Sequence, residues 1–241
     1  MLNLPNAITL SRIALAPLVA TLPLIVRWEV RLLAFGLFLI AAISDGLDGA
    51  LARRRNAITE LGQLLDPLAD KLLLIATLVP MFHLAGSRYE WGLMSPHVRP
   101  IIEGTYGVMA REHSPPGSEA FPFLTPWGPV GFPLWILVIV MGRELLMTVF
   151  RQLAARRGVI IAAIGPAKWK TAMQMIWIGA AYFWFAMATL ASDRGWNGAA
   201  WRFGAHLLGF IGITSMFIAV TLTLYSLWLY IKRYGHVFRA H

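Results

Sequence analysis

The chain has 241 residues, of which 58% are hydrophobic and only 14% are charged, and its mean hydropathy is +0.63. Soluble domains carry about 25% charged residues, so this composition excludes an ordinary soluble domain and favours a membrane protein. The absence of cysteine excludes disulfides and thiol chemistry. The net charge of +9 is accompanied by no nucleic-acid-binding motif, so we expect it to reflect membrane topology and anionic lipid headgroups instead of nucleic acid.

Six apolar segments follow one another along the chain, each near the ~20 residues that a transmembrane helix requires. They cover approximately residues 7–27, 31–53, 62–85, 133–155, 167–192 and 204–231. Residues at about 86–132 form a connecting loop rich in Pro, Gly, Ser and aromatic side chains, to which we assign no chemistry. The sequence therefore predicts an all-α, polytopic membrane protein with six transmembrane helices, organised as a single membrane-embedded domain over residues 1–241.

Lys and Arg are unevenly distributed between the two sets of connecting loops. Eleven of the 21 lie in three short stretches, namely the 53–60 loop, the 151–170 turn and the C-terminal tail, whereas seven are spread over the longer opposite loops. Loops rich in Lys and Arg remain in the cytoplasm. We therefore expect both termini in the cytoplasm and the 86–132 loop outside. The first apolar segment lacks signal-peptide features, so we expect it to be retained as a span.

Charged residues interrupt the first four segments, whereas residues 171–192 and 203–231 contain none. The interrupting residues are Arg12, Asp45, Asp48, Asp66, Asp70, Lys71, Arg143 and Glu144. A charge within a span is costly and usually faces a cavity, so these positions indicate a functional site. Arg143 in particular must have a partner or a ligand, and we do not expect the partner to be Glu144, because adjacent side chains on a helix point apart.

Four of these acids occur together in the stretch SDGLDGALARRRNAITELGQLLDPLADK, residues 44–71. Helical spacing places them on two faces: Asp45, Asp48, Gly49 and Ala52 on the first helix, and Gly62, Asp66 and Asp70 on the second. A short polar turn joins the two helices, so we expect antiparallel neighbours with converging carboxylates. Carboxylates gathered in a low dielectric require a compensating cation, and oxygen-only ligands favour Mg²⁺, Mn²⁺ or Ca²⁺. Four carboxylates suffice for two such ions.

Small and basic residues accompany the acids. Gly49 and Gly62 lack side chains where the helices would face one another, so a flat base or a phosphate could approach the backbone there. Arg53 is placed to meet a phosphate near the membrane surface. The alternative interpretation is that the acids are solvated helix ends and the glycines are packing positions. The coincidence of four acids and two glycines on two facing stripes favours the functional interpretation.

These residues carry a resemblance to the CDP-alcohol phosphotransferase family, whose signature is D-x2-D-G-x2-A-R-x8-G-x3-D-x3-D. Every fixed position is filled: Asp45, Asp48, Gly49, Ala52, Arg53, Gly62, Asp66 and Asp70. The resemblance implies a six-helix, usually dimeric enzyme of the bacterial inner membrane with a cytoplasm-facing site. It implies two divalent cations, Mg²⁺ or Mn²⁺, held by Asp45, Asp48, Asp66 and Asp70. It further implies that Gly49, Ala52, Arg53 and Gly62 border the CDP moiety and that Asp70 is the catalytic base.

Within the family, the segments NLPNAITLSR, LDPLADK, RELLMTVFR and KWKTAMQM are similar to those of the bacterial branch that transfers a phosphatidyl group from CDP-diacylglycerol to sn-glycerol 3-phosphate. Four cations in the latter two segments, Arg143, Arg151, Lys168 and Lys170, could bind the acceptor's phosphate. Without such an anion they would be surplus positive charge beside the metals. The alternative is that Arg151, Lys168 and Lys170 are ordinary positive-inside flanks of the spans. Asn6, Thr9 and Arg12 could line the rim of the site.

Other acceptors and other classes of protein remain open. Phosphatidylglycerol would make the chain a cardiolipin synthase, and inositol phosphate would make it a phosphatidylinositol phosphate synthase. A cation transporter would also bury carboxylates, but it would spread them along a path and would show repeats. A scaffold protein would leave the aspartates without a purpose.

Overall fold

The computed structural model describes residues 4–55, 60–85, 123–125, 128–130, 132, 134–159, 161, 165–196 and 198–235. Within α2 and α3, the side chains of residues 45–55, 60–64, 66, 83 and 85 lie outside the described part. The description therefore covers the backbone of the aspartate-rich stretch on both sides of residues 56–59.

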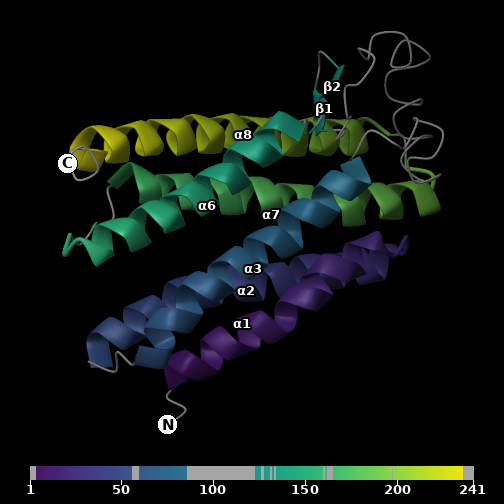
Figure 1. Ribbon diagram of the computed structural model, residues 1–241. Coiled ribbons are helices and arrows are strands. Elements are labelled where there is room, and N and C mark those ends of the chain that lie inside the picture. Colours follow the sequence, from purple (N-terminus) through teal and green to yellow (C-terminus); the bar gives the residue numbers. More distant parts are fainter. Residues whose placement is uncertain are drawn as a thin grey trace.

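Six long α-helices make up most of the described chain (Figure 1). They are α1 (Leu4–Thr21), α2 (Trp28–Arg55), α3 (Glu60–Ala85), α6 (Leu134–Arg156), α7 (Gly165–Asp193) and α8 (Ala199–Tyr234). Each occupies one of the six predicted apolar segments, which confirms the all-helical prediction for these segments. The largest difference is at the end of the first segment, where a 3-10 turn, Leu22–Leu24, follows α1. Pro23 within this turn has no backbone N–H with which to continue the α-helix.

Three of the helical segments are long and apolar enough to cross a membrane by length and composition. They are Asn6–Leu24, Ala167–Ala191 and Ala199–Tyr234. Helix α6 differs because its middle carries Arg143, Glu144 and Arg151. Three spans are therefore supported within the described residues.

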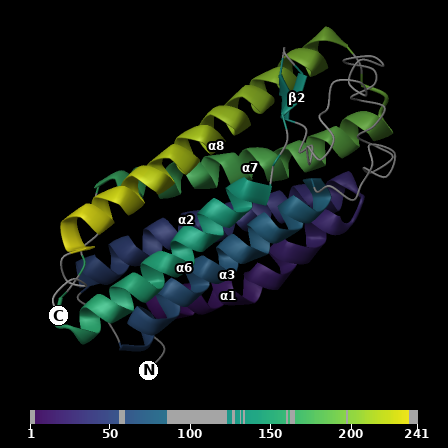
Figure 2. The ribbon, with the colours of Figure 1, turned by 45° about the horizontal axis from the view of Figure 1, so that its top comes forward.

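Helix α7 is the centre of the bundle. It packs against α2 and α8, while α1 packs against α2 and α3, and α6 packs against α8 and α3 (Figure 2). The span in α7 is 67% buried, against 28% for α1 and 39% for α8. Its aromatic side chains fill the core: Tyr182 stacks on Phe38 of α2, and Trp177 contacts Phe132 edge to face. Functional groups on α7 are therefore held by a rigid, well-packed element.

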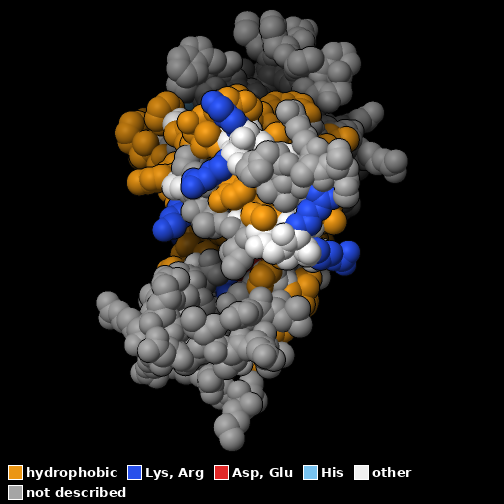
Figure 3. Space-filling view, turned by 60° about the vertical axis from the view of Figure 1, so that its left-hand side comes forward, with side chains coloured by type: hydrophobic (Ala, Val, Ile, Leu, Met, Phe, Trp, Pro, Cys, Tyr) orange, Lys and Arg blue, Asp and Glu red, His pale blue; other side chains and the backbone are white. Residues whose placement is uncertain are grey.

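Helix α1 begins and α8 ends at the same end of the bundle (Figure 1). The exposed cations at the ends of α6 and α8 and at the start of α7 lie at this end, which is shown in Figure 3. They are Arg151, Arg156, Arg157, Lys168, Lys232 and Arg233. The described basic residues of the 151–170 turn and of the end of α8 thus gather on one end of the molecule.

At the opposite end, Arg31 joins the start of α2 to the end of α7. Its side chain is 2% exposed and donates hydrogen bonds from Nη1 to Thr189 Oγ1 at 2.6 Å and from Nε to the carbonyl oxygen of Pro23 at 3.1 Å. The guanidinium also lies over the ring of Phe185, 5.8 Å from its centroid. These contacts offset the cost of burying the charge.

Part of the predicted 86–132 loop is ordered into a β-hairpin. Strands β1 (Phe123–Thr125) and β2 (Gly128–Val130) pair antiparallel, with Phe123 opposite Val130, and β1 packs against α8. The sequence predicted only a connecting loop here, so the hairpin is an addition to that expectation. Strands this short give no readable alternation of apolar and polar residues. Residues 86–122 lie outside the described part of the chain.

Candidate active site

A cavity of about 720 Å³ lies between α1, α3, α6 and α7. Its charged lining residues come from all four helices: Arg12, Asp70, Lys71, Arg143, Glu144, Arg151 and Lys170. Thr148, Gln152, Thr171 and Gln174 add polar groups, and Leu73, Leu74, Met147 and Met175 are among the apolar ones. So many ionisable groups around one cavity inside a helical bundle indicate a ligand site.

Helix α1 contributes a buried polar face to this region. Asn6, Thr9 and Arg12 recur every three residues and are 1–2% exposed, so they lie on the side that packs against the other helices. Arg12 Nη1 donates a hydrogen bond to Asp70 Oδ1 at 3.0 Å. The Asp70 side chain is 55% exposed and borders the cavity, so its carboxylate is held by Arg12 and remains accessible to a ligand.

The other predicted metal ligands cannot be compared with this geometry. Asp45 and Asp48 lie in α2 and Asp66 lies in α3, but their side chains are outside the described part, as are Gly49, Ala52, Arg53 and Gly62 of the predicted CDP site. The described residues contain no group of three potential metal ligands. Asp70 is thus the one predicted metal ligand with a described side chain, and its hard oxygen donors suit Mg²⁺ or Mn²⁺.

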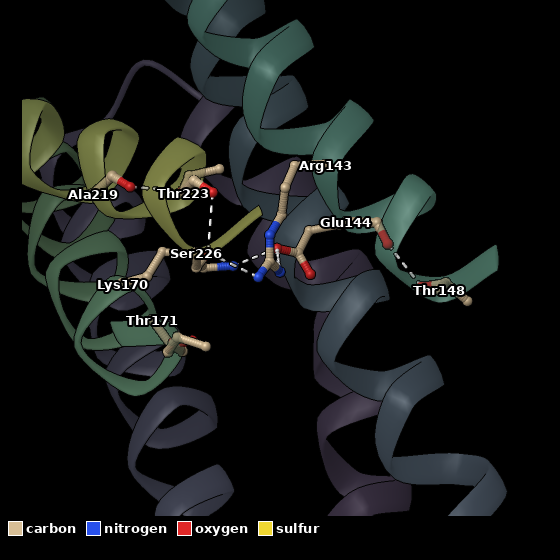
Figure 4. Close-up of polar contacts among 9 residues, drawn as sticks. Arg143, Glu144, Thr148, Lys170, Thr171, Ala219, Thr223 and Ser226 are labelled. Atoms are coloured by element: carbon tan, nitrogen blue, oxygen red, sulfur yellow. Dashed lines mark hydrogen bonds and ion pairs between the residues drawn. The ribbon is translucent and has the colours of Figure 1, made fainter. Parts of the chain in front are cut away.

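Glu144 links the two cationic helices of the cavity (Figure 4). Its Oε1 atom accepts hydrogen bonds from Arg143 Nη1 at 2.9 Å and from Lys170 Nζ. Arg143 also donates from Nη2 to Ser226 Oγ of α8 at 3.1 Å, and Ser226 in turn donates to the Thr223 carbonyl. Arg143 and Lys170 are 7% and 5% exposed, so the shared carboxylate makes their joint burial possible.

The expectation that Glu144 does not partner Arg143 is therefore wrong. It rested on the directions in which adjacent side chains leave a helix, about 100° apart. Both side chains have several rotatable bonds, and the ammonium group of Lys170 draws the carboxylate into the gap between α6 and α7. Arg143 and Lys170 therefore have an anion within the protein, contrary to the expectation that they would be surplus positive charge.

The four predicted acceptor-site cations divide into two groups. Arg143, Arg151 and Lys170 line the same cavity as Asp70. Arg151 is exposed, and its guanidinium lies over the ring of Tyr230 at 5.9 Å from the centroid. Lys168 is also exposed but does not line the cavity, because it lies about half a turn of α7 away from Lys170.

Two further residues of the cavity had no role assigned to them from the sequence. Glu144 was recognised as an intramembrane charge but was given no role. Gln174 lies one helical turn after Lys170, so the i, i+4 spacing within KWKTAMQM would have placed it on the same face. This spacing is the sequence feature from which Gln174 could have been identified as a cavity residue.

A sequence profile of the CDP-alcohol phosphatidyltransferase family matches residues 2–114 and 118–229, which is most of the chain. The protein belongs to this family. The match includes every signature residue from Asp45 to Asp70 and all the lining residues of the cavity. The described cavity thus lies within the part of the chain that the family profile matches.

Individual family members are similar over much of their length. A CDP-diacylglycerol–glycerol-3-phosphate 3-phosphatidyltransferase of Bacillus subtilis is 31% identical over 75% of this chain and 76% of its own length. A chloroplastic/mitochondrial enzyme of the same name from Arabidopsis thaliana is 27% identical over 97% of this chain, which spans 63% of that relative's length. A CMP-forming cardiolipin synthase from Oryza sativa is 28% identical over 97% of the chain and 57% of its own length.

Proposed function

We propose that the protein transfers the phosphatidyl group of CDP-diacylglycerol to sn-glycerol 3-phosphate, releasing CMP and forming phosphatidylglycerophosphate. The observation that carries this proposal is the cavity that brings Asp70 together with Arg143, Arg151 and Lys170. An acceptor that bears its own phosphate needs such cations in addition to those that meet the CDP-lipid. The names of the Bacillus and Arabidopsis relatives agree with this acceptor.

The chemistry follows from the two sides of the cavity. Arg143, Arg151 and Lys170 bind the phosphate of the acceptor, which leaves its primary hydroxyl near Asp70. Asp70 takes the proton of this hydroxyl as the oxygen attacks the phosphorus attached to the lipid, and the bond from that phosphorus to CMP breaks. Arg12 keeps the Asp70 carboxylate oriented for this step. Because both reactants are held in one cavity in a fixed orientation, the bimolecular reaction becomes effectively unimolecular, which lowers its entropic cost.

The metal and nucleotide sites complete the proposal. Asp45, Asp48, Asp66 and Asp70 would hold two divalent cations, Mg²⁺ or Mn²⁺, which neutralise the diphosphate and the departing CMP. The all-oxygen donor set and the accessible Asp70 carboxylate fit such ions. Gly49, Ala52, Arg53 and Gly62 border the CDP moiety, where the small residues allow close approach and Arg53 meets a phosphate.

We also propose that all six helices cross the membrane and that residues 1–241 form one catalytic domain with both ends in the cytoplasm. The start of α1 and the end of α8 lie at the same end of the bundle, and the basic character of that end supports this orientation (Figure 3). A homodimer is proposed from the family resemblance alone, and the molar mass of the purified protein in detergent tests it.

The test of the activity is a panel of acceptors. Purified protein is supplied with CDP-diacylglycerol and Mg²⁺ together with glycerol 3-phosphate, phosphatidylglycerol or inositol phosphate, and CMP release and the lipid product are measured. We expect phosphatidylglycerophosphate from the first acceptor and little product from the others. No CMP release with any acceptor would contradict the enzyme assignment and would favour a protein of another class, such as a cation transporter.

The second candidate is a cardiolipin synthase, because the Oryza relative with that name matches 97% of this chain. Such an enzyme would accept phosphatidylglycerol, a lipid anion that enters from the bilayer. The buried position of Lys170 and Arg143 inside the cavity favours a small phosphate ester over a lipid. Consumption of phosphatidylglycerol in place of glycerol 3-phosphate would replace the first proposal with this one.

A further inference from the structure

Gln174 is a buried amide that faces the cavity. Its side chain on α7 is 3% exposed and lines the cavity, and it makes no hydrogen bond with the part of the chain that the structure describes. A glutamine amide has two N–H donors and an oxygen with two lone pairs. Buried amides are almost always hydrogen-bonded, so a group that the protein leaves to the cavity is available to a ligand.

The other uncharged polar side chains of the cavity are either hydrogen-bonded within their own helix or exposed at the rim. Thr148 and Thr171 donate their hydroxyl hydrogens to carbonyls of their own helices, those of Glu144 at 2.7 Å and Ala167 at 3.2 Å. Gln152 is exposed at the cavity rim. Gln174 is therefore the buried, uncharged cavity residue, among those described, that offers both a donor and an acceptor.

The position of Gln174 relative to the charged groups defines what it can contact. It lies one turn, about 6 Å, beyond Lys170 on the same face of α7. Lys170 belongs to the cluster proposed to bind the acceptor's phosphate, and Asp70 on α3 borders the same cavity. A small acceptor that contacts both the cations and Asp70 therefore occupies the cavity that Gln174 lines. Its apolar neighbours Met147 and Met175 compete only weakly for hydrogen bonds.

We propose that Gln174 is a specificity-determining residue that hydrogen-bonds the secondary hydroxyl of the acceptor, the hydroxyl on the middle carbon of glycerol 3-phosphate. This inference rests on the proposed function and adds the recognition of an uncharged group to that of the phosphate. A site built to hydrogen-bond a hydroxyl rejects the analogue that lacks it, because the polar group of the site is then left unpaired. Gln174 thus discriminates between three-carbon acceptors of the same charge and length that differ only in the middle hydroxyl.

The test compares two acceptors in two proteins. Glycerol 3-phosphate and 3-hydroxypropyl phosphate, which lacks the middle hydroxyl, are each supplied to the full-length protein with saturating CDP-diacylglycerol. We expect the wild type to prefer glycerol 3-phosphate by at least about tenfold in kcat/KM. In Gln174→Leu this preference should fall to near unity, through a loss with glycerol 3-phosphate and not with the analogue. The acceptor and residue changes form a double-mutant cycle.

Gln152→Leu is the matched control, because it makes the same chemical change at the exposed rim and should keep the wild-type preference. Gln174→Met, which retains an unbranched side chain, serves if the leucine variant does not fold. An equal loss with both acceptors would show that Gln174 has a structural role only and would overturn the inference. The absence of any preference in the wild type, which needs no variant, would overturn it as well. If the wild type uses neither acceptor, the proposed function itself fails.

Discussion

Arg12 and Asp70 are 58 residues apart in the chain, yet their side chains form an ion pair of 3.0 Å between α1 and α3. Arg12 is 1% exposed, whereas the Asp70 side chain is 55% exposed at the cavity. The amino-terminal helix therefore supplies the group that orients the carboxylate proposed as the catalytic base.

Arg12→Ala should lower kcat by about 10- to 100-fold, the usual effect of removing a residue that orients a catalytic ligand. The acceptor KM should change little, because Arg12 does not belong to the cluster that binds the phosphate. Steady-state kinetics in detergent measures both values. Arg27→Ala is the control, since Arg27 is exposed and lies 3.8 Å from its partner Glu29. A rise in acceptor KM with unchanged kcat would assign Arg12 to substrate binding instead.

Asp66→Asn should lower the transfer rate by about 10²- to 10³-fold, because each carboxylate removed weakens the stabilisation of charge in the transition state. EDTA should abolish the activity of the wild type, and added Mg²⁺ or Mn²⁺ should restore it. Asp193→Asn, at the far end of α7, is the matched control and should retain activity. Full activity in EDTA would contradict the metal site.

Glu144→Gln should destabilise the protein, because Arg143 and Lys170 would then be buried without a shared anion. A cost of about 1–3 kcal/mol corresponds to a fall in Tm of roughly 2–12 °C for a chain of this size. Glycerol 3-phosphate should raise the Tm of this variant by more than it raises that of the wild type, since its phosphate replaces the missing charge. Thermal unfolding with and without the acceptor checks both effects. Glu29→Gln makes the same change at an exposed position, and a similar response there would refute the role of Glu144.

Alanine substitutions of the two lysines at the start of α7 should affect the acceptor KM to different extents. Lys170→Ala should raise the acceptor KM by about 10- to 100-fold, the effect of losing a charge-assisted hydrogen bond, and should leave the KM for CDP-diacylglycerol nearly unchanged. Lys168→Ala should change the acceptor KM by less than about threefold, because Lys168 is exposed and lies outside the cavity. Arg143→Ala should be more damaging than either, since it also removes the bond to Ser226. Equal effects of the two lysines would argue against the cavity as the acceptor site.

The chain contains no cysteine, so single cysteines report the topology without background. A cysteine at Arg157, in the turn after α6, should not react with an impermeant maleimide added to intact cells, whereas one at Arg194, in the turn after α7, should react. Both positions are exposed in the structure. The reverse labelling pattern would invert the proposed orientation and place the cavity on the outer side.

The six helices could be predicted because a span needs about twenty apolar residues, and runs of this length are visible in the sequence. Asp70 and Arg143 could be predicted as site residues because a charge within a span is costly. Arg151 and Lys170 were placed with them only through the segments that resemble the family. The sharing of Glu144 by Arg143 and Lys170 was not predictable, because it depends on how α6 and α7 pack and on side-chain torsions that spacing does not determine. The hairpin at Phe123–Val130 was also missed, since its pairing is stabilised by contact with α8 and not by its own pattern.

The Arg31 contacts at the opposite end of the bundle constrain the order in which the protein is assembled. Its hydrogen-bond partner Thr189 is synthesised 158 residues later, a delay of roughly 8–30 s at cellular translation rates. During that interval α2 carries a guanidinium whose final partners on α7 do not yet exist, and a buried charge without them is unfavourable. The packing of the first three helices therefore becomes final only after α7 has entered the membrane. A ribosome that stalls before residue 189 should leave a nascent chain that is inserted but loosely packed and open to membrane proteases.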